Sequence, residues 1–263
     1  MNQILSSTNE NISSYATTNS TNWAGYEYHN SGGVTGDYGS WSVPTVSAPS
    51  TGCGNVHNSA LNCTSVFWIG ETVNAGGTAS GSGVYLDQGG TLQTVKCSTS
   101  ACSSITTQYA AFYEFVPSVP FTYVPSSLIS VSANDGFTAF LNYTTTLGGA
   151  AGIELVDANN GNLWSVVHSS QKPYYGQFIV ERPLAGTFTN GSAWCWPLPK
   201  FTNTEFDNAY FNSYGIYGLS PSSQYVMTNP HISINIGPVS NSRSLSDYFT
   251  VAWATSSGTN GFC

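Results

Sequence analysis

Two glutamates stand out among the acidic residues of this chain, because each lies inside an apolar run. Glu114 belongs to the run AAFYEFVP (residues 110–117) and Glu181 to the run FIVERP (residues 178–183). A carboxyl group among aromatic and branched side chains loses hydration, which disfavours its charged form and raises its pKa. Such a group is either a hydrogen-bonded structural acid or an acid–base catalyst. Glu114 and Glu181 are therefore the first candidates for acid–base chemistry.

Five aspartates lack this setting. They lie among turn residues or at the ends of apolar segments, where short carboxyl side chains commonly accept hydrogen bonds from nearby backbone N–H groups. We interpret them as structural; they are Asp37, Asp135, Asp157, Asp207 and Asp247.

The sequence contains no recognisable motif of the serine, metal-dependent or aspartic hydrolases. The GxSxG elbow of serine hydrolases, the HExxH helix of metalloproteases and the Asp-Thr-Gly or Asp-Ser-Gly signatures of aspartic proteases are absent. The histidines are too scattered to complete a zinc ribbon; they are His29, His57, His168 and His231. We expect no metal and no cofactor.

The cysteines fall into pairs that indicate disulfides rather than a metal centre. No pair has the CxxC spacing of a zinc ribbon. The alternative is a set of free buried thiols in a cytosolic protein. The expected pairs, among the connectivities that six cysteines allow, are Cys53/Cys63, Cys97/Cys102 and Cys195/Cys263.

Charge is scarce and mostly negative. Charged residues form only 7% of the chain, the formal net charge is −8, and no Lys or Arg precedes Lys96. Nucleic acid and anionic membranes are poor partners for such a surface, because both are themselves negative. Few titratable groups also limit charge repulsion in acid, so we expect tolerance of low pH.

Several features favour a secreted protein. Disulfides persist in oxidising compartments, and five Asn-x-Ser/Thr sites agree with export, although a chain rich in Asn, Ser and Thr contains such sites by chance. Residues 1–20 have neither the basic start nor the long apolar core of a signal peptide, so we expect a processed or recombinant form. No stretch reaches the roughly 18 apolar residues of a membrane span.

The apolar pattern predicts an all-β fold. Short alternating or apolar runs are separated by clusters of Gly, Ser, Asn and Pro, and no run shows the period of an amphipathic helix. Because such turns leave no room for crossover helices, we expect one antiparallel β-sandwich in residues 21–263 after a flexible polar leader in residues 1–20. The expected strands are Tyr38–Val43, Ser65–Gly70, Gly83–Gln88, Gln108–Val116, Leu128–Ser132, Phe137–Tyr143, Gly152–Val156, Asn162–His168, Tyr175–Glu181, His231–Ile236 and Tyr248–Ala254.

Turn chemistry supports this segmentation. Residues 133–136 read ANDG and residues 157–161 read DANNG, which supply Asn and Gly where hairpins need positive φ. Strand parity adds a second constraint. In residues 84–88 the even positions share a face with Gln88, and in residues 175–181 the odd positions share a face with Glu181.

Six motifs follow one another along the chain: NWAGY (22–26), WSVP (41–44), FWIG (67–70), DQGGT (87–91), FYEFVP (112–117) and QFIVERP (177–183). Each fragment alone is weak, but six in this order are a fairly specific signal. The series resembles that of the glutamic peptidases, or eqolisins, and the match extends from about residue 21 to residue 211.

The resemblance implies a concanavalin-like or jelly-roll-like sandwich of two long sheets, whose concave face holds a polypeptide substrate. Glu181 matches the family's catalytic glutamate and Gln88 its catalytic glutamine. Glu181 would take a proton from the attacking water and pass it to the leaving amine, while the Gln88 amide would stabilise the oxyanion. Trp68 and Glu114 match cleft positions, although Trp68 would otherwise be a core residue and Glu114 a structural acid. The implied enzyme is an acid-acting endopeptidase.

Three departures from the family pattern affect these expectations. The insertion GGTASGSG (76–83) lengthens the segment before Gln88 and makes Gln93 the alternative catalytic glutamine. Family precursors usually carry a basic propeptide, yet the first basic residue here is Lys96. The sequence FVP (115–117) also replaces a more aromatic run, which would alter the preference for substrate side chains.

Three rival functions remain open at this point. A lectin-like, carbohydrate-binding sandwich would carry aromatic rings on a flat exposed face, and an adhesion module would explain the richness in Ser, Thr and Asn. A glycosidase would need two facing carboxylates, for which Glu114 and Glu181 are the pair. A shared water between Gln88 and Glu181 would favour the peptidase, and nothing argues against a monomer.

Overall fold

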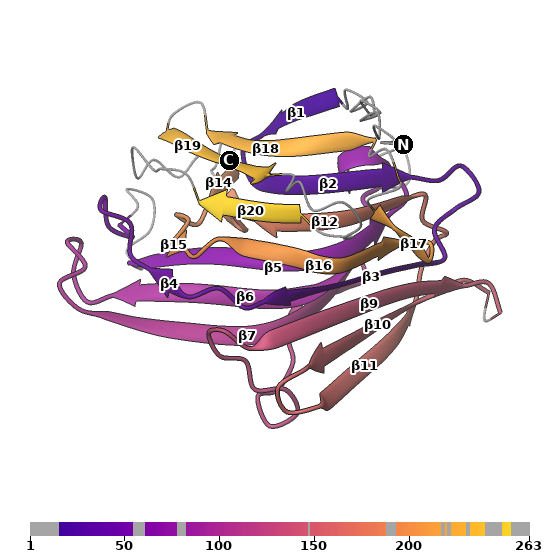
Figure 1. Cartoon of the computed structure of the whole chain (residues 1–263), viewed down its shortest axis with the longest axis horizontal. Coiled ribbons are helices and arrows are strands. Elements are labelled where there is room, and N and C mark those ends of the chain that lie inside the picture. Colours follow the sequence, from indigo (N-terminus) through magenta and orange to yellow (C-terminus); the bar gives the residue numbers. More distant parts are fainter. Residues whose placement is uncertain are drawn as a thin grey trace, which may run out of the picture.

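Strands joined by short turns make up almost the whole fold (Figure 1). The computed structural model describes residues 16–54, 61–77, 83–146, 148–187, 193–216, 219, 222–229, 232–239 and 249–253. A single 3₁₀ turn, η1 (Ala75–Gly77), interrupts the strands of this part of the chain. The strands are β1 (Ala16–Ser20), β2 (Trp23–His29), β3 (Gly36–Ser42), β4 (Val46–Ser47), β5 (Asn62–Thr72), β6 (Leu86–Cys97), β7 (Ile105–Val116), β8 (Val119–Tyr123), β9 (Gly136–Thr144), β10 (Ala150–Asp157), β11 (Asn162–Ser169), β12 (Tyr175–Glu181), β13 (Leu184–Thr187), β14 (Ala193–Cys195), β15 (Lys200–Phe201), β16 (Thr204–Phe211), β17 (Tyr214–Gly215), β18 (Ser223–Asn229), β19 (Ile232–Val239) and β20 (Phe249–Trp253).

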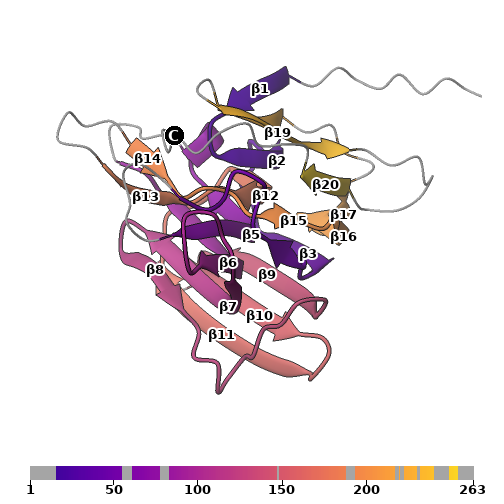
Figure 2. The same cartoon turned by 90° about the vertical axis from the view of Figure 1, so that its left-hand side faces the viewer.

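One 16-stranded sheet folds over on itself to form a two-layer sandwich (Figure 2). The strand order is β11-β10-β9-β3-β16-β20-β19-β18-β2-β12-β5-β6-β7-β8. We call β2, β12, β5, β6, β7 and β8 the groove layer, and β11, β10, β9, β3, β16 and β20 the cover layer. The pairings are antiparallel except for β1, which runs parallel to β18. The predicted antiparallel β-sandwich is confirmed.

The main core lies between the two layers. Phe67 and Phe178 of the groove layer pack against Phe206 and Phe249 of the cover layer, with ring centroids 6.2 Å and 6.5 Å apart. A smaller core lies on the opposite face of the groove layer and includes Trp68. The central strands of the groove layer are therefore buried on both faces.

The two predicted turns have the expected chemistry. Asn134 has a φ of 69° and Gly161 a φ of 68°, the left-handed conformation that Asn and Gly tolerate best. Asp157 accepts hydrogen bonds from the Asn159 backbone N–H at 3.0 Å and from the Asn160 side chain. Asp157 therefore has the structural role that was expected.

Some expected strands are wrong or incomplete. Residues 128–132 form no strand, because the backbone N–H groups of Leu128 and Ile129 turn back to the carbonyl of Pro125. Gly83 has a φ of 98° and lies outside β6, which begins at Leu86 and continues to Cys97. The expectation also missed β2, β16 and β18, whose residues lack a clean alternation.

The ends of the expected segments fall partly outside the described residues. Residues 1–15 of the expected leader, His231, Tyr248, Ala254 and Cys263 are among these. Residues 16–20 form β1 and pair with β18, so the part of the leader next to the domain is extended and hydrogen-bonded. The described part of the chain contains no helix with the length and apolar character that a membrane span needs.

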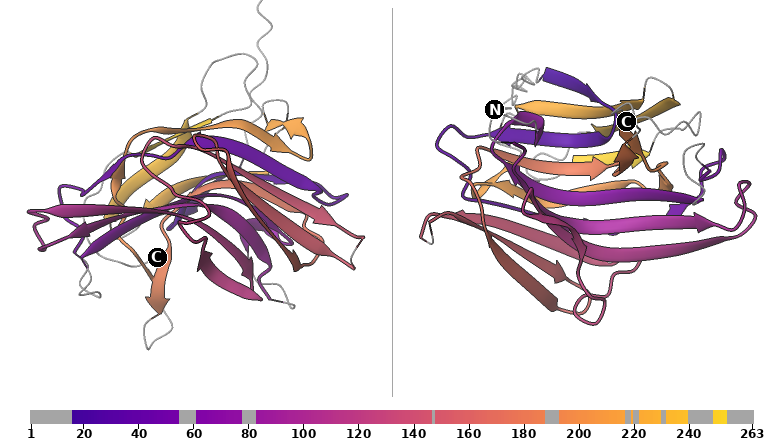
Figure 3. Two further views of the ribbon diagram at one scale, coloured as in Figure 1. Left: turned by 90° about the horizontal axis from the view of Figure 1, so that it is seen from below. Right: turned by 180° about the vertical axis from the view of Figure 1, so that it is seen from behind.

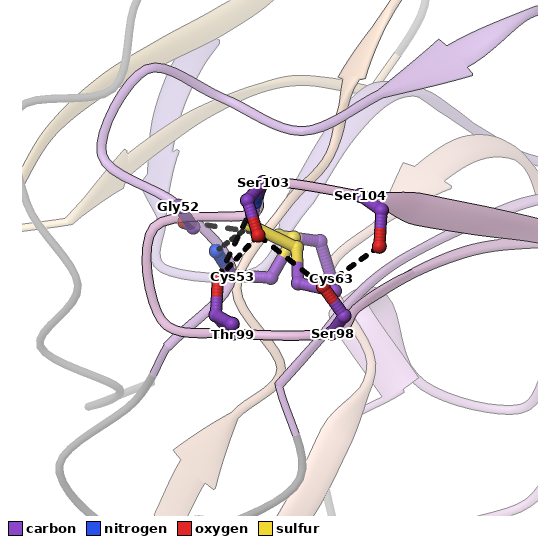
Figure 4. The surroundings of a disulfide bond; sticks show 9 residues. Gly52, Cys53, Cys63, Ser98, Thr99, Ser103 and Ser104 are labelled. Carbon is purple, nitrogen blue, oxygen red and sulfur yellow. Dashed lines mark hydrogen bonds between the residues drawn. A yellow bond between two sulfur atoms is a disulfide. The ribbon is translucent and has the colours of Figure 1, made fainter.

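One disulfide joins the segment before β5 to the start of β5, and another closes the turn between β6 and β7. The predicted Cys53–Cys63 and Cys97–Cys102 bonds are both present. Figure 4 shows the Cys53–Cys63 bond beside the turn at residues 98–104, where serine and threonine side chains bond to one another. Cys195 is also disulfide-bonded, while Cys263 lies outside the described residues, so the third predicted pair stays a prediction.

The contact between the layers predicts a large cost for removing a central ring. Phe178 is fully buried between the layers, so Phe178→Ala is expected to lower the free energy of unfolding by about 3–5 kcal/mol, measured by guanidinium denaturation. Phe140→Ala is the matched control, because Phe140 is 36% exposed on the outer face. Equal losses from the two variants would contradict the placement of the core.

Candidate active site

A groove of about 870 Å³ lies on the face of the groove layer that points away from the cover layer. Its floor consists of alternate side chains of β5, β6 and β7. One wall is β8, and the other is the segment from Glu181 to β13, which projects from the sheets as a hairpin with β14 (Figure 3, left). The lining residues are Asn62, Thr64, Val66, Gln88, Leu92, Thr94, Lys96, Gln108, Tyr109, Ala110, Glu114, Phe121, Tyr123, Glu181, Pro183, Leu184 and Trp196.

Gln88 and Glu114 are held together across two neighbouring strands. They are direct partners in the β6–β7 register, so both side chains leave the same face of the sheet. The Nε2 group of Gln88 donates a hydrogen bond to Oε2 of Glu114 at 2.6 Å. The Oε1 atom of Gln88 is buried without a hydrogen-bond partner among the described residues. Gln88 therefore retains an unused acceptor beside the groove.

The carboxyl group of Glu114 is shifted towards its neutral form. Burial raises its pKa, while the hydrogen bonds from the Gln88 side chain and from the backbone of Phe121 oppose this rise. Since Gln88 is a neutral donor, it holds Glu114 in place without the strong pull towards ionisation that a cation would exert.

Glu181 lies at the end of β12, where the chain leaves the sheet for the groove wall. Its Oε2 atom accepts a hydrogen bond from the indole Nε1 of Trp68 at 2.8 Å. Burial raises the pKa of Glu181 to about 7, against the lowering effect of Trp68; nearby Glu114 raises it further, and Trp23 and Asn22 lower it. Burial outweighs these hydrogen bonds, so the proton is retained at acidic pH.

The indole of Trp68 is placed by a glycine. Gly70 lies two residues later on the same face of β5, and a Cβ atom there would come within 2.6 Å of Cζ3 of Trp68. The ring of Trp23 packs edge-on against Trp68, with centroids 5.3 Å apart. The indole therefore lies over the backbone at Gly70, with its N–H directed at Glu181.

Arg182 fixes the wall next to Glu181. Its guanidinium donates to the carbonyl oxygens of Trp196 at 2.8 Å and of Cys195 at 3.5 Å, and its backbone N–H donates to the carbonyl of Asn22 at 2.7 Å. Burial lowers the pKa of Arg182 to about 10, which still leaves it charged in acid. The side chain of Arg182 thus orders the segment that brings Trp196 to the groove.

The structure brings together most of the side chains singled out in the sequence. Gln88, Glu114 and Glu181 line one groove, and Trp68 lies beneath it, bonded to Glu181. Gln93, the alternative glutamine, points to the other face of β6, where Ser65 and Thr91 bond to it between the layers. Gln93 lies five positions after Gln88 on the same strand, and because this offset is odd the two side chains cannot share a face.

Several residues of the site escaped sequence reasoning. Phe121 and Tyr123 of β8 form a wall, and Gly70 and Arg182 position other residues. The signal for Gly70 was present in the motif FWIG, where a glycine two residues after a tryptophan on one strand face leaves room for a ring. The β8 wall carried no such signal, because its placement depends on the turn after β7.

The cysteine sulfurs offer no metal ligand. Cys53, Cys97 and Cys102 have sulfur atoms within 4.8 Å of one another and form the one group of three potential metal ligands found among the described residues. All three belong to disulfides, so none supplies the thiolate that zinc requires.

Solved structures share this two-layer fold. A scytalido-glutamic peptidase with a transition state analog inhibitor matches with a TM-score of 0.60 at 16% identity, over 89% of this chain and 98% of that chain. SCP-B, a member of the eqolisin family solved with the tripeptide Ala-Ile-His, matches with a TM-score of 0.53 at 14% identity, over 89% and 98% of the two chains. At this identity the likeness places the chain in a class of β-sandwich proteins by fold alone.

The sequence itself gives the family. Residues 21–235 match the model of the Peptidase A4 family, and the chain therefore belongs to that family and is a peptidase, a hydrolase. No curated protein matches the chain. The resemblance to glutamic peptidases is confirmed, and the carbohydrate-binding alternative is not favoured.

The hydrogen bond from Trp68 predicts a measurable shift at Glu181. Trp68→Phe keeps a ring in the site but removes the N–H group that favours the carboxylate, so the pKa of Glu181 should rise above its value of about 7. Carbon-detected NMR of ¹³C-labelled Glu side chains measures this pKa directly. Trp164→Phe, on β11 of the cover layer, is the control; an unchanged Glu181 titration in Trp68→Phe would disprove the role of the bond.

Proposed function

We propose that the protein is an acid-acting endopeptidase in which Glu181 and Gln88 carry out hydrolysis of the peptide bond. The observation that supports this most is that Gln88, Glu114 and Glu181 line one open groove. Each of the two catalytic side chains has a fixed partner: Glu114 holds Gln88, and Trp68 holds Glu181. A constellation held by packed neighbours suits a site whose geometry must be ready before the substrate arrives.

The resemblance implied a general base, a Glu181 carboxylate that takes a proton from water; we propose instead that Glu181 acts from its protonated form, because burial raises its pKa. With a pKa of about 7, it is a carboxylic acid at acidic pH. The acid proton moves to the scissile carbonyl oxygen as water attacks the carbonyl carbon, and a proton of that water moves to the other carboxyl oxygen. This gives a neutral gem-diol and regenerates the acid. The acid then protonates the leaving nitrogen and takes a proton from the diol, so that an amine and a carboxylic acid leave.

Gln88 stabilises the oxygen on which charge develops. One hydrogen of its Nε2 group is used by Glu114, and the second is available to the diol oxygen of the substrate. The unpartnered Oε1 atom accepts a hydrogen bond from the attacking water. Because an amide does not titrate, Gln88 performs both tasks at low pH.

The groove suits an extended polypeptide. Lining residues on β6 run from Gln88 to Lys96, a length of about 26 Å, which accommodates several residues of an extended chain. Polar and apolar side chains both line it, so it offers contacts to the backbone and to the side chains of a peptide. Two fold relatives were solved with a transition state analog and with a tripeptide, which supports the same class of ligand here.

A glycosidase is less well supported. Glu114 and Glu181 both line the groove, as that reaction would require. However, the shared groove also holds Gln88, and family membership favours peptide substrates. The disulfides agree with a secreted enzyme, and the absence of a cofactor and a monomeric form both stay predictions.

Substitution of the two groups tests the proposal. Cleavage of a denatured protein at pH 4 is expected to fall by about 100-fold or more in Glu181→Gln, which cannot exchange protons, and by about 100-fold in Gln88→Ala, which lacks the N–H donor. Gln171→Ala, on the exposed surface, should retain parent activity. Parent-level cleavage by Glu181→Gln would rule out the assigned site.

The protonated starting state also predicts the pH profile. The kcat/KM of the parent should be high in acid and fall as pH rises through about 7, because the raised pKa of Glu181 marks the loss of the acid proton. Initial rates should be measured only where near-ultraviolet circular dichroism shows the native fold. A kcat/KM that instead rises through this range would show that Glu181 starts as a carboxylate.

A further inference from the structure

Three carboxyl groups lie between the two layers, directly beneath the groove floor. Asp37, Glu71 and Asp87 are 2%, 1% and 4% exposed. Glu71 and Asp87 are direct partners in the β5–β6 register, and the next pair in that register is Gly70 and Gln88. The acidic pair therefore occupies the interior face of the two strands that carry the site on their other face.

Asp37 reaches this pair from the cover layer. It lies on β3 and approaches the backbone of β12 at Gly176, where a Cβ atom would come within 2.0 Å of its Oδ2 atom. Gly176 is in turn the β12 partner of Glu71. The three acids thus join both layers at one end of the sandwich, and only a glycine at position 176 allows this approach.

Few partners compensate these groups. Both carboxyl oxygens of Asp37 and both of Glu71 are buried without a hydrogen-bond partner in the described ranges. Asp87 accepts from the Oγ of Ser170 at 2.5 Å, and His168 lies close enough to favour its charge. The nearby backbone N–H of Asn212 favours the charge of Asp37 but donates to the carbonyl of Gly36 at 2.8 Å. No Lys or Arg of the described residues contributes to the pKa of any of the three.

Protons explain this cluster better than a metal ion does. The carboxyl oxygens of the three acids do not all lie within 4.8 Å of one another, as three ligands of one ion would. Burial together with Asp87 raises the pKa of Glu71 to about 8, and burial raises that of Asp87 to about 6. Burial and Glu71 raise the pKa of Asp37 well above its usual range.

We propose that Asp37, Glu71 and Asp87 form a proton-dependent brace that holds β5 and β6 in place beneath Gln88 and Trp68 and confines the folded enzyme to acid. When neutral, the acids fit between the layers. When ionised, they place like charges in a site without a cation, which favours separation of the layers. They are positioning residues, because none of them lines the groove.

The direction of the pH effect follows from proton linkage. The unfolded chain binds these protons with ordinary carboxyl affinity, near pH 4, whereas the folded chain keeps them up to about pH 6 for Asp87 and about pH 8 for Glu71. Between about pH 4 and about pH 8 the folded state therefore binds more protons than the unfolded state, so the free energy of unfolding falls as pH rises. Stability is fully present below about pH 4 and lost through the folded-state pKa values.

The test compares unfolding of the full chain at pH 3–9 by near-ultraviolet circular dichroism, without substrate. The parent should lose its native signal as pH rises between about 6 and 8. Glu71→Gln, a neutral isostere of the protonated acid, should move this midpoint upwards by about one pH unit or more. Glu154→Gln, on β10, is the matched control and should keep the parent midpoint. Glu181 also binds a proton in this range, so the difference between Glu71→Gln and parent isolates the brace.

Three outcomes would overturn the brace. The first is a parent that stays native with equal urea stability from pH 4 to 8, and the second is a Glu71→Gln unfolding midpoint equal to that of the parent. The third is a metal site in its place, shown if calcium chloride raises the melting temperature of the parent at pH 7.5 but not that of Glu71→Gln. If Glu71→Gln does not fold, urea unfolding of the parent at several pH values gives the number of linked protons, expected to be about two or more. A slope of zero would overturn the proposal.

The brace also predicts an effect on catalytic activity, and this prediction rests on the proposed peptidase function. Glu71→Gln should keep cleavage at pH 4 within about twofold of the parent and extend the active range to higher pH. If Glu181 and Gln88 proved not to be catalytic, the prediction about activity would no longer hold, but the prediction about unfolding would be unaffected. Because the Glu181 proton sets its own limit at about pH 7, this extension of the active range is expected only between about pH 6 and 7. An upward shift in unfolding without any gain of activity in that range would contradict the coupling of the brace to the site.

Discussion

Burial of β5 and β6 on both faces is the constraint on which the rest of the structure depends. Successive side chains of a strand point to opposite faces, so one set of residues forms the groove floor and the next forms the interface with the cover layer. Trp68 and Gln88 belong to the first set, and Glu71 and Asp87 to the second. A polar group on either face is removed from water, and it must find a hydrogen-bond partner or lose its charge.

The chain meets this requirement with neutral partners and protons rather than with cations. It has 13 acidic and only 5 basic residues. At the groove, an amide holds Glu114 and an indole holds Glu181. Between the layers, one hydroxyl and one imidazole accompany Asp87. Because such partners do little to favour ionisation, burial raises the pKa of these acids, and the same physical cause underlies both the proposed acid chemistry and the proposed brace.

Close approach depends on glycines at two positions. Gly70 leaves space for the Trp68 ring, and Gly176 leaves space for the carboxyl group of Asp37. A methyl group at either site would meet side-chain atoms at 2.6 Å or less. Gly70 lies on the face that carries the groove and Gly176 on the interior face. On both faces of the groove layer, the packing therefore leaves no room for even one additional methyl group at these positions.

The sequence by itself determined the all-β class, the turns at residues 133–136 and 157–161, two disulfides and the family, because these depend on local alternation, turn chemistry and motif order. It also selected Glu114 and Glu181, since a carboxyl group in an apolar strand is visible without a structure, and it selected Gln88 through the resemblance to the glutamic peptidases. It could not identify β2 or β16, where packing overrides a weak pattern, and it misassigned residues 128–132, where a turn after Pro125 replaces the strand and buries Ile129 but leaves Leu128 exposed. Only the tertiary structure decided that Glu114 holds Gln88, that Gln93 faces the interior, and that Asp37 meets Glu71. The first two depend on the pairing register of β5, β6 and β7, and the third on the packing of the two layers, and local sequence encodes neither.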